Sequence, residues 1–298
     1  MNKAVISEVR DLTADPLALA ELAATDAPRA PAFIVTIYGD VVEPRGGMLW
    51  MGTLIECCAR HGLNESLVRT AVSRLVGAGR LEGVRIGRRS FYRLSEPARA
   101  EFREAARLLF APPPEPEDWL LCLSDALRDV DLPLPWARLA PTVALAPNRE
   151  DIAPVAGVLL RAKQLDGHGD LGQLASERWG LSGVAEAYAS FLARHGALRD
   201  LLSATVPLSP EDALTLRLRL VHDYRHAALS DPRLPRAAYP HDWLADEARR
   251  LFVAAYVGLS KHAESHVSAR FLSPEGHLAP CNEETERRLF QLRREAAA

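Results

Sequence analysis

Four prolines between positions 112 and 116 divide this 298-residue chain more sharply than any other feature of its sequence. Each proline lacks the backbone N–H that a helix or a central strand needs, and each disfavours helical dihedrals in the residue before it. The segment 111–117 is therefore expected to form a stiff linker. At roughly 100–200 residues per domain, the chain has room for two or three domains around it.

The apolar periodicity of the rest of the chain, and the turn and proline-rich segments that interrupt it, predict an α+β, multidomain protein. We expect consecutive parts: a flexible tail over 1–30 with a possible short helix at 16–24, a first domain over 31–110, the linker 111–117, a central α+β domain over 118–182 and a helical domain over 183–298.

Two short apolar runs, at 119–123 and 142–146, predict buried strands in the central domain. A helix is expected over 151–162, with a third strand near 163. In the helical domain, Ser209 and Pro210 are typical of a helix start, so a helix should run from there to about Leu229. Further helices are expected from about 242 to 259 and at the C-terminus.

Composition excludes several classes of protein. With 48% hydrophobic and 25% charged residues the chain has ordinary globular usage. No apolar run approaches the roughly 18 residues of a membrane span, and the N-terminus lacks the apolar core of a secretory signal. The four cysteines form no C-x-x-C pair. We therefore expect a cytoplasmic protein with reduced thiols and no membrane partner.

The arginines are concentrated in one stretch of an otherwise acidic chain. Positions 60–103 hold ten arginines, no lysine and four glutamates, which gives this stretch a net charge of +6 in a chain whose total is −3. A basic island of this kind is an electrostatic footprint for a polyanion such as nucleic acid.

Residues 64–79 predict an amphipathic helix inside that island. Asn64 is a suitable N-cap, and Gly79 is a suitable C-terminal stop. At 100° per residue, the apolar side chains at 68, 71, 72 and 75 share one face. The outer face and its edge carry the hydrogen-bonding and guanidinium groups that can read base edges in a major groove. With the N-cap included, the candidate DNA-binding residues here are Asn64, Ser66, Arg69, Thr70, Ser73 and Arg74.

The elements on either side of this helix extend the pattern. Residues 53–60 predict a shorter helix, and His61 and Gly62 form the turn, which gives a helix-turn-helix layout. Residues 81–94 predict a hairpin, in which a basic tip can lie on phosphates or in a minor groove, as in a winged helix-turn-helix. The candidate DNA-binding residues of the hairpin are Arg85, Arg88 and Arg89.

An alternative is an amphipathic helix with a solvated face beside an ordinary hairpin. It accounts for each element singly. It does not account for three elements in this order with arginines on the predicted DNA-facing parts. We therefore favour DNA binding.

At these residues the sequence resembles the PaaX family of phenylacetic-acid degradation operon repressors. The resemblance spans roughly residues 31–260. It is carried by Gly39-Asp40, Pro44-Arg45-Gly46-Gly47, Leu67-Val68-Arg69-Thr70-Ala71, Gly87-Arg88-Arg89-Ser90, Trp119-Leu-Leu, Asp231-Pro-Arg-Leu-Pro235 and Trp243.

The resemblance implies an N-terminal winged helix, a central ferredoxin-like (Cas2-like) domain and a helical C-terminal domain. It also implies a dimeric repressor that leaves double-stranded DNA when phenylacetyl-CoA or a related aryl-acyl-CoA binds. A two-fold dimer in turn predicts an inverted repeat as operator. No cofactor is implied. Residues 33–42 would be the first helix of the winged domain, although their β-branched side chains alone favour a strand. We follow the resemblance at this point.

An effector with phosphates and an adenine suits arginine forks and aromatic planes. The candidate effector-binding residues are Arg217, Tyr224, Arg225, Tyr239, His241 and Trp243. Packing and surface ion pairs are an equally good interpretation of these residues.

Other chemistry has weaker support. The pairs His222/His226 and His262/His266 have a spacing that allows metal binding, but ordinary packed or surface histidines are favoured. Asp125 follows a strand roughly where Cas2-like nucleases place an aspartate, and a CoA-thioester-acting enzyme is a further alternative. We expect neither activity and assign no catalytic or metal-binding residue. A co-regulator that binds DNA only with a partner protein also remains open.

Overall fold

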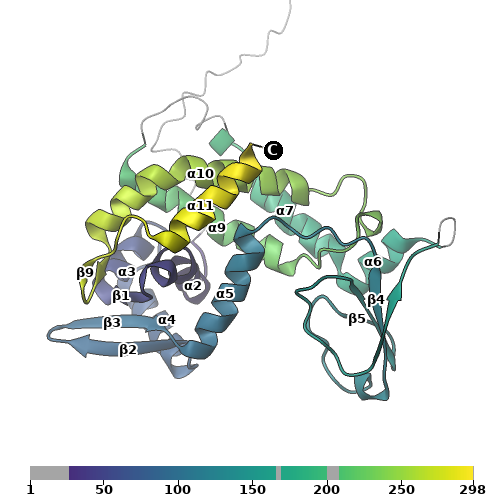
Figure 1. Ribbon diagram of the computed structural model, residues 1–298. Helices are drawn as coiled ribbons and strands as arrows, with labels where there is room; N and C mark the ends of the chain where they lie inside the picture. The colour runs from purple at the N-terminus through teal and green to yellow at the C-terminus, as the bar shows by residue number, and fades with distance from the viewer. Residues whose placement is uncertain (1–26, 166–168, 200–207, 298) are drawn as a thin grey trace, which may run out of the picture. The chain divides into compact units, whose positions relative to one another are not determined.

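The structure is a computed structural model that describes residues 27–165, 169–199 and 208–297 (Figure 1). The possible helix at 16–24 lies outside the described residues. In the described part, no helix is long and apolar enough to cross a membrane.

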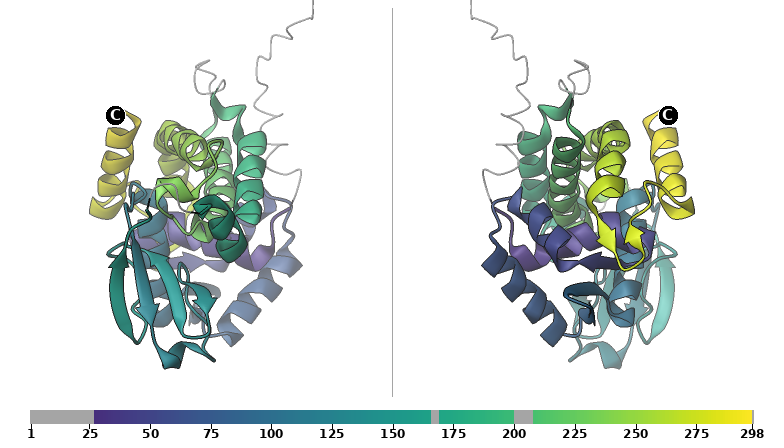
Figure 2. Two further views of the ribbon diagram at one scale, coloured as in Figure 1. Left: turned by 90° about the vertical axis from the view of Figure 1, so that its right-hand side faces the viewer. Right: turned by 90° about the vertical axis from the view of Figure 1, so that its left-hand side faces the viewer.

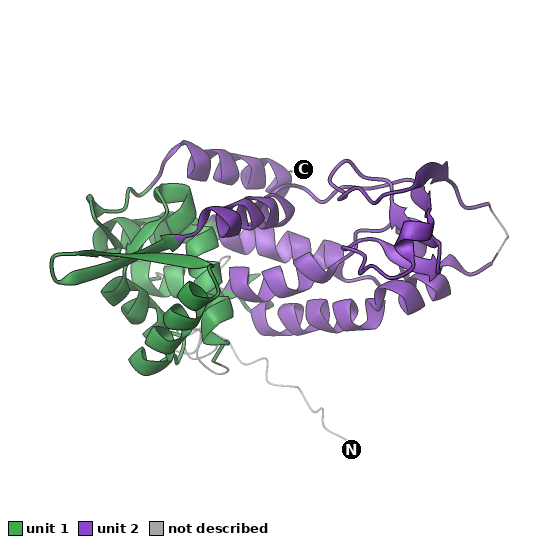
Figure 3. Ribbon diagram, turned by 90° about the horizontal axis from the view of Figure 1, so that it is seen from below, with its two compact units in different colours: residues 1–93, 196–219, 258–280 green, residues 94–195, 220–257, 281–298 purple. Residues whose placement is uncertain are grey.

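The chain folds into two compact units that each combine segments distant in sequence (Figure 3). Unit 1 consists of residues 1–93, 196–219 and 258–280, and unit 2 of residues 94–195, 220–257 and 281–298. These units differ from the consecutive domains that the sequence predicts. The long helices α9 (Pro210–Ser230) and α10 (Ala245–Arg270) contribute residues to both. α9 has the predicted bounds, whereas α10 continues well past the predicted end at 259.

Unit 1 contains residues 60–93 of the arginine-rich stretch. Its helical elements are α2 (Ala30–Ile37), the π-helical turn η1 (Tyr38–Val42), the 3-10 turn η2 (Glu43–Arg45), α3 (Met51–Ala59) and α4 (Glu65–Gly77). Its strands are β1 (Met48–Trp50), β2 (Leu81–Ile86) and β3 (Arg89–Leu94), which form one sheet in the order β1-β3-β2, and the short pair β8 (Leu272–Ser273) and β9 (Gly276–His277).

Residues 33–42 are helical, as the family resemblance implies, and not a strand. Pro31 stands in the first turn of α2, where its missing N–H costs nothing. The apolar residues then recur at the helical spacing that one buried face requires. All of them are fully buried: Phe33, Ile34, Ile37, Tyr38, Val41 and Val42. Tertiary burial therefore outweighs the local strand preference of the β-branched side chains.

A buried ionic cluster holds η1 and η2 to α9 and α10 within unit 1. Arg217 donates from Nε to Asp40 at 3.0 Å and from Nη1 to Glu264 at 2.6 Å. Arg45 also pairs with Glu264, and its Nε donates to the carbonyl of Ala279 at 2.9 Å. Two arginines and two carboxylates thus compensate each other where water is excluded.

Unit 2 contains a four-stranded antiparallel sheet in the order β5-β6-β4-β7 (Figure 2). Its strands are β4 (Trp119–Leu123), β5 (Ala137–Ala140), β6 (Val143–Pro147) and β7 (Val158–Ala162), with the 3-10 turn η3 (Asp125–Leu127) after β4. The two strands predicted at 119–123 and 142–146 are present, and β5 is an additional strand that the sequence pattern does not reveal.

The predicted helix over 151–162 is wrong. Residues 151–157 are irregular, and residues 158–162 form strand β7, which pairs with β4 from Trp119↔Ala162 to Leu123↔Val158. The apolar side chains of Ile152 and Val155 pack on the core of the sheet. The last predicted strand therefore lies at 158–162 and not near 163.

The remaining elements of unit 2 are helical. They are α5 (Glu96–Phe110), α6 (Leu171–Trp179), α7 (Leu181–His195), the 3-10 turn η4 (Arg236–Ala238) and α11 (Glu283–Ala296). Residues 111–117, the predicted linker, form neither helix nor strand. Arg249 anchors the start of this linker, because Nη2 donates to the carbonyl of Ala111 at 3.1 Å while Nε pairs with Glu295 at 2.7 Å.

Candidate nucleic-acid interface

Helix α4 presents a polar, basic outer face. Its apolar residues Val68, Ala71, Val72 and Leu75 form the buried face, as the helical wheel predicts, whereas Leu67 and Val76 are exposed. Asn64 caps the helix, accepting from the backbone N–H of Leu67 at 2.9 Å. All six candidate DNA-binding residues of this segment are exposed: Asn64, Ser66, Arg69, Thr70, Ser73 and Arg74.

The β2–β3 hairpin carries the other three candidates, and all of them are exposed as well. Gly87 has φ of +59°, so the tight turn at the tip needs glycine. Arg85 donates to the carbonyl of Gly87 at 3.3 Å, and the Arg89 guanidinium lies 5.0 Å from the ring centroid of Trp50. One contact within the hairpin and one from β1 thus hold two of its arginines.

An open hollow of about 470 Å³ lies between α4 and the hairpin. Arg69, Ser73 and Arg85, all predicted for DNA binding, line it. It is also lined by Met51, Val72, Val76, Gly83, Val84, Ser90 and Tyr92. The hollow therefore joins the two predicted DNA-facing elements into one concave surface with polar groups around apolar side chains.

Gly83, Ser90 and Tyr92 were not identified as site residues from the sequence. A Cβ at position 83 would lie 2.8 Å from Cε1 of Tyr92, so glycine is what allows the Tyr92 ring to lie against β2. Ser90 adds a hydroxyl to the lining. The strand alternation of the hairpin gives a signal for which side chains share a face, but it does not say which face turns toward α4.

On α4 and on the β2–β3 hairpin, a glutamate pairs with an arginine of the same element. Glu65 accepts from Nε of Arg69 at 2.7 Å, one helical turn apart on α4, and both side chains are more than half exposed. Glu82 on β2 accepts from Nη2 of Arg93 on β3 at 2.9 Å.

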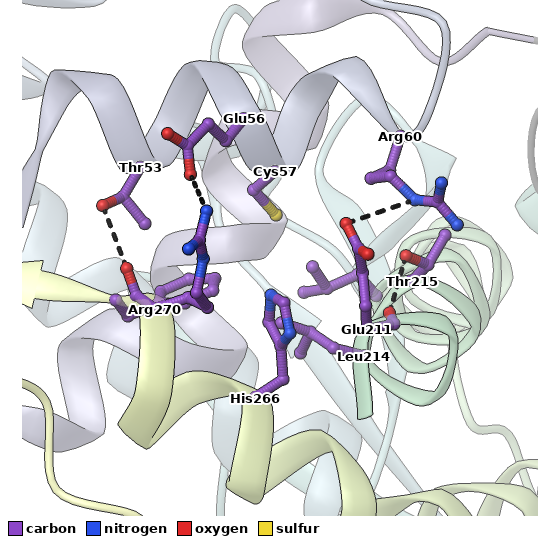
Figure 4. A pocket seen from close by; sticks show the side chains of 11 residues that line it. Thr53, Glu56, Cys57, Arg60, Glu211, Leu214, Thr215, His266 and Arg270 are labelled. Carbon is purple, nitrogen blue, oxygen red and sulfur yellow. Dashed lines mark hydrogen bonds and ion pairs between the residues drawn. The ribbon is translucent and has the colours of Figure 1, made fainter. Parts of the chain in front are cut away.

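A second, small pocket lies where α3 meets α9 and α10 in unit 1 (Figure 4). It holds about 40 Å³, enough for water but far below the roughly 300 Å³ at which small-molecule sites begin. Arg270 pairs with Glu56 at 3.4 Å, and Arg60 pairs with Asp212 at 2.7 Å. These contacts fix the helix that precedes α4 against α9 and α10.

The six predicted effector residues are divided between the two units. Arg217 belongs to unit 1, has no exposed surface and pairs with Asp40 and Glu264. The other five belong to unit 2. Of these, Tyr224 is buried and stacks on Phe252 with ring centroids 4.1 Å apart.

The aromatic residues near the Asp231 loop make a hydrogen-bonded cluster. Tyr239 donates to Asp231 at 2.5 Å, and Tyr188 donates to the other carboxylate oxygen at 3.0 Å. Burial raises the pKa of Tyr239, so its hydroxyl stays a donor. Trp243 stacks on Tyr239 at 4.5 Å. Both side chains thus have packing roles, and effector binding by them stays a prediction.

The described residues give little support for an enzymatic or metal-binding site. Asp125 is exposed and pairs with Arg128 at 3.1 Å. Ser124 accepts from the N–H of Ala126 at 3.2 Å, as a helix-cap residue does. Within the ranges that the structure describes, no three His, Cys, Asp or Glu side chains are grouped so that they could hold a metal ion.

A basic helix face beside an arginine-bearing hairpin is the inventory of a nucleic-acid-binding protein. Two family models match the chain: "PaaX-like protein" over residues 29–98 and "PaaX-like protein C-terminal domain" over residues 179–269. The chain is also 32% identical over 271 residues to the transcriptional repressor PaaX of Escherichia coli, covering 83% of this chain and 85% of the relative. This protein belongs to the PaaX family, as its sequence motifs suggested.

The matched relative is a transcriptional repressor, in agreement with the class of protein predicted for this chain. Among solved structures, an uncharacterised protein of Mycobacterium tuberculosis matches with a TM-score of 0.43 and 20% identity, covering 72% of this chain and 89% of the other.

Proposed function

We propose that this protein is a transcriptional repressor that binds double-stranded DNA through α4 and the β2–β3 hairpin, as a winged helix-turn-helix. One observation carries the proposal: all nine side chains that the sequence predicts for DNA binding are exposed, and three of them, Arg69, Ser73 and Arg85, line one hollow between these two elements.

The contacts divide by their chemistry. Helix α4 enters a major groove, where Arg69, Thr70 and Ser73 meet base edges and supply sequence preference. Arg88 and Arg89 of the hairpin meet phosphates and supply salt-dependent affinity. The hollow between α4 and the hairpin binds the sugar–phosphate backbone of one DNA strand. Arg85 and Ser90 lie beside its phosphate, and apolar side chains lie beneath its sugar.

Dimerisation is the second part of the proposal. The strand order β5-β6-β4-β7 supports a ferredoxin-like central domain, although its connections hold only a 3-10 turn and an irregular segment in place of helices. β7 is an edge strand with exposed Val158, Leu159 and Leu160. An apolar edge of this kind favours pairing with a second copy. A two-fold dimer then binds an inverted repeat with half-sites about one DNA turn apart or a multiple of it.

Release from DNA is the third part. An aryl-acyl-CoA, with phenylacetyl-CoA as first candidate, binds in unit 2 and lowers operator affinity. Tyr224, Tyr239 and Trp243 are used in packing, so contacts to the phosphates fall to Arg225, which is half-buried, and to the exposed His241. The effector acts only through its different affinity for the DNA-binding and released states.

A gel-shift titration of the full chain on DNA from upstream of its own gene tests the proposal. We expect a specific shift that phenylacetyl-CoA reverses, whereas CoA and free phenylacetate do not. A shift that needs another protein would favour the co-regulator alternative. Cleavage of the DNA with Mg²⁺ present, or hydrolysis of the thioester, would favour the enzymatic alternatives. No binding at all would contradict DNA recognition by this chain.

A further inference from the structure

We infer that Glu65 is a positioning residue for DNA sequence reading, which acts by holding the guanidinium of Arg69. The inference deepens the proposed function and rests on it. Glu65 was not among the residues that the sequence predicted for DNA binding, and its carboxylate opposes phosphate. Its place on the outer face of α4 therefore needs a reason.

The geometry gives that reason. Glu65 is the first residue of α4, where a negative charge is stabilised by the helix N-terminus. Its Oε1 accepts from Nε of Arg69 at 2.7 Å, so the two terminal nitrogens of that guanidinium are not used by this contact. Those two nitrogens form the fork that matches O6 and N7 of guanine.

Arg69 lies on the face of α4 that lines the hollow, together with Ser73 one turn further along. An exposed arginine samples many rotamers, and fixing it before binding reduces the entropy that is lost on contact with a base. Glu65 also lowers the attraction of this face for any phosphate. The carboxylate therefore raises the ratio of specific to non-specific affinity in two ways: it holds Arg69, and it weakens non-specific binding.

The chain supplies a matched control. Glu82 and Arg93 form a second exposed Glu–Arg pair, across β2 and β3, with a similar N···O distance of 2.9 Å and similar exposure. Neither residue lines the hollow. Glu82→Gln removes the same charge from the same basic unit without touching the proposed reader Arg69.

The experiment compares wild type, Glu65→Gln and Glu82→Gln on duplexes that the wild type enriches from a randomised library and on unselected duplexes. We expect Glu65→Gln to bind unselected DNA more tightly, with a salt slope steeper by about 0.9 if Arg69 turns to a phosphate. We expect it to lose about tenfold in the ratio of selected to unselected affinity. Glu82→Gln should keep that ratio. Glu65→Asp, which keeps the charge, should recover part of it.

An Arg69→Ala background separates positioning from bulk charge. There, Glu65→Gln should leave the selected-to-unselected ratio unchanged, because the group that Glu65 holds is gone. An unchanged ratio for Glu65→Gln in the otherwise native chain, an equal loss for Glu82→Gln, or a further loss in the Arg69→Ala background would each overturn the inference. A wild type that enriches no sequence would instead show that the proposed function itself fails. Thermal unfolding of each variant checks that the fold is intact.

Discussion

Nε of Arg217 lies 3.0 Å from Oδ2 of Asp40, and both side chains are fully buried although 177 positions separate them in the chain. Breaking a buried ion pair from one side leaves an uncompensated charge and costs about 3 kcal/mol or more. Asp40→Asn should therefore lower the free energy of unfolding by about that amount, measured by urea titration. Glu56→Gln, which removes the exposed partner of Arg270, should cost under about 1 kcal/mol. Equal costs would refute the assignment of a buried network.

Arg69→Ala should weaken operator preference and leave non-specific binding. A bidentate arginine–guanine contact contributes roughly 1–3 kcal/mol of discrimination, so we expect a fall of about tenfold or more in the ratio of operator to random-DNA affinity. Competition gel shifts at fixed salt measure this ratio. Preserved preference would exclude Arg69 from base reading.

Arg88→Ala combined with Arg89→Ala should flatten the salt dependence of DNA binding. Each phosphate contact contributes about 0.9 to the slope of log affinity against log salt, so the slope should fall in magnitude by about 2. Fluorescence anisotropy over a range of salt concentrations measures it. If the slope stays that of wild type, the hairpin tip does not contact phosphate.

Gly83→Ala should weaken DNA binding without unfolding the protein. The new methyl would stand 2.8 Å from the Tyr92 ring and push it into the hollow between α4 and the hairpin. The control is Gly77→Ala at the end of α4, where a methyl meets nothing within 4 Å and should stabilise the helix by up to about 1 kcal/mol. Unaltered DNA affinity of Gly83→Ala would show that the hollow does not contact DNA.

Stability should fall in acid partly because of His222, whose pKa burial lowers to about 4 from an unfolded value near 6.5. The unfolded chain then takes up the proton more readily, so this contribution is complete above pH 6.5 and is lost as pH falls toward 4, up to roughly 3 kcal/mol. His222→Gln should flatten the fall in unfolding free energy between these pH values. A slope identical to that of wild type would contradict this role for the imidazole.

Much of unit 1 could be predicted from sequence because its signals are local. Asn64 and Gly79 mark the ends of α4, and the spacing of Val68, Ala71, Val72 and Leu75 defines which face is buried. The exposed residues then follow from geometry. The partners of those residues could not be predicted, because the face of the hairpin that turns toward α4 depends on tertiary packing.

Unit 2 was harder to predict because its strands depend on tertiary pairing that no local signal reveals. Residues 158–160 are apolar without alternation, and only the pairing of 158–162 with β4 decides that they form a strand and not the end of a helix. Among the predicted effector residues, Arg217 of unit 1 and Tyr224 of unit 2 carry the right chemistry for a phosphate and an adenine. Their burial and their partners come from segments far away in the sequence, and no local pattern reveals them.

The cluster around Arg217 also limits how this molecule can be divided. A cut at the proline-rich linker would leave Asp40 and Arg45 on one fragment and Arg217 and Glu264 on the other. In the sequence, the first hundred or so residues have the pattern of an independent domain. Two of their buried charges, however, are neutralised only by residues that are synthesised much later. During synthesis, the part that we propose to read DNA is therefore completed only after the ribosome has delivered nearly the whole polypeptide.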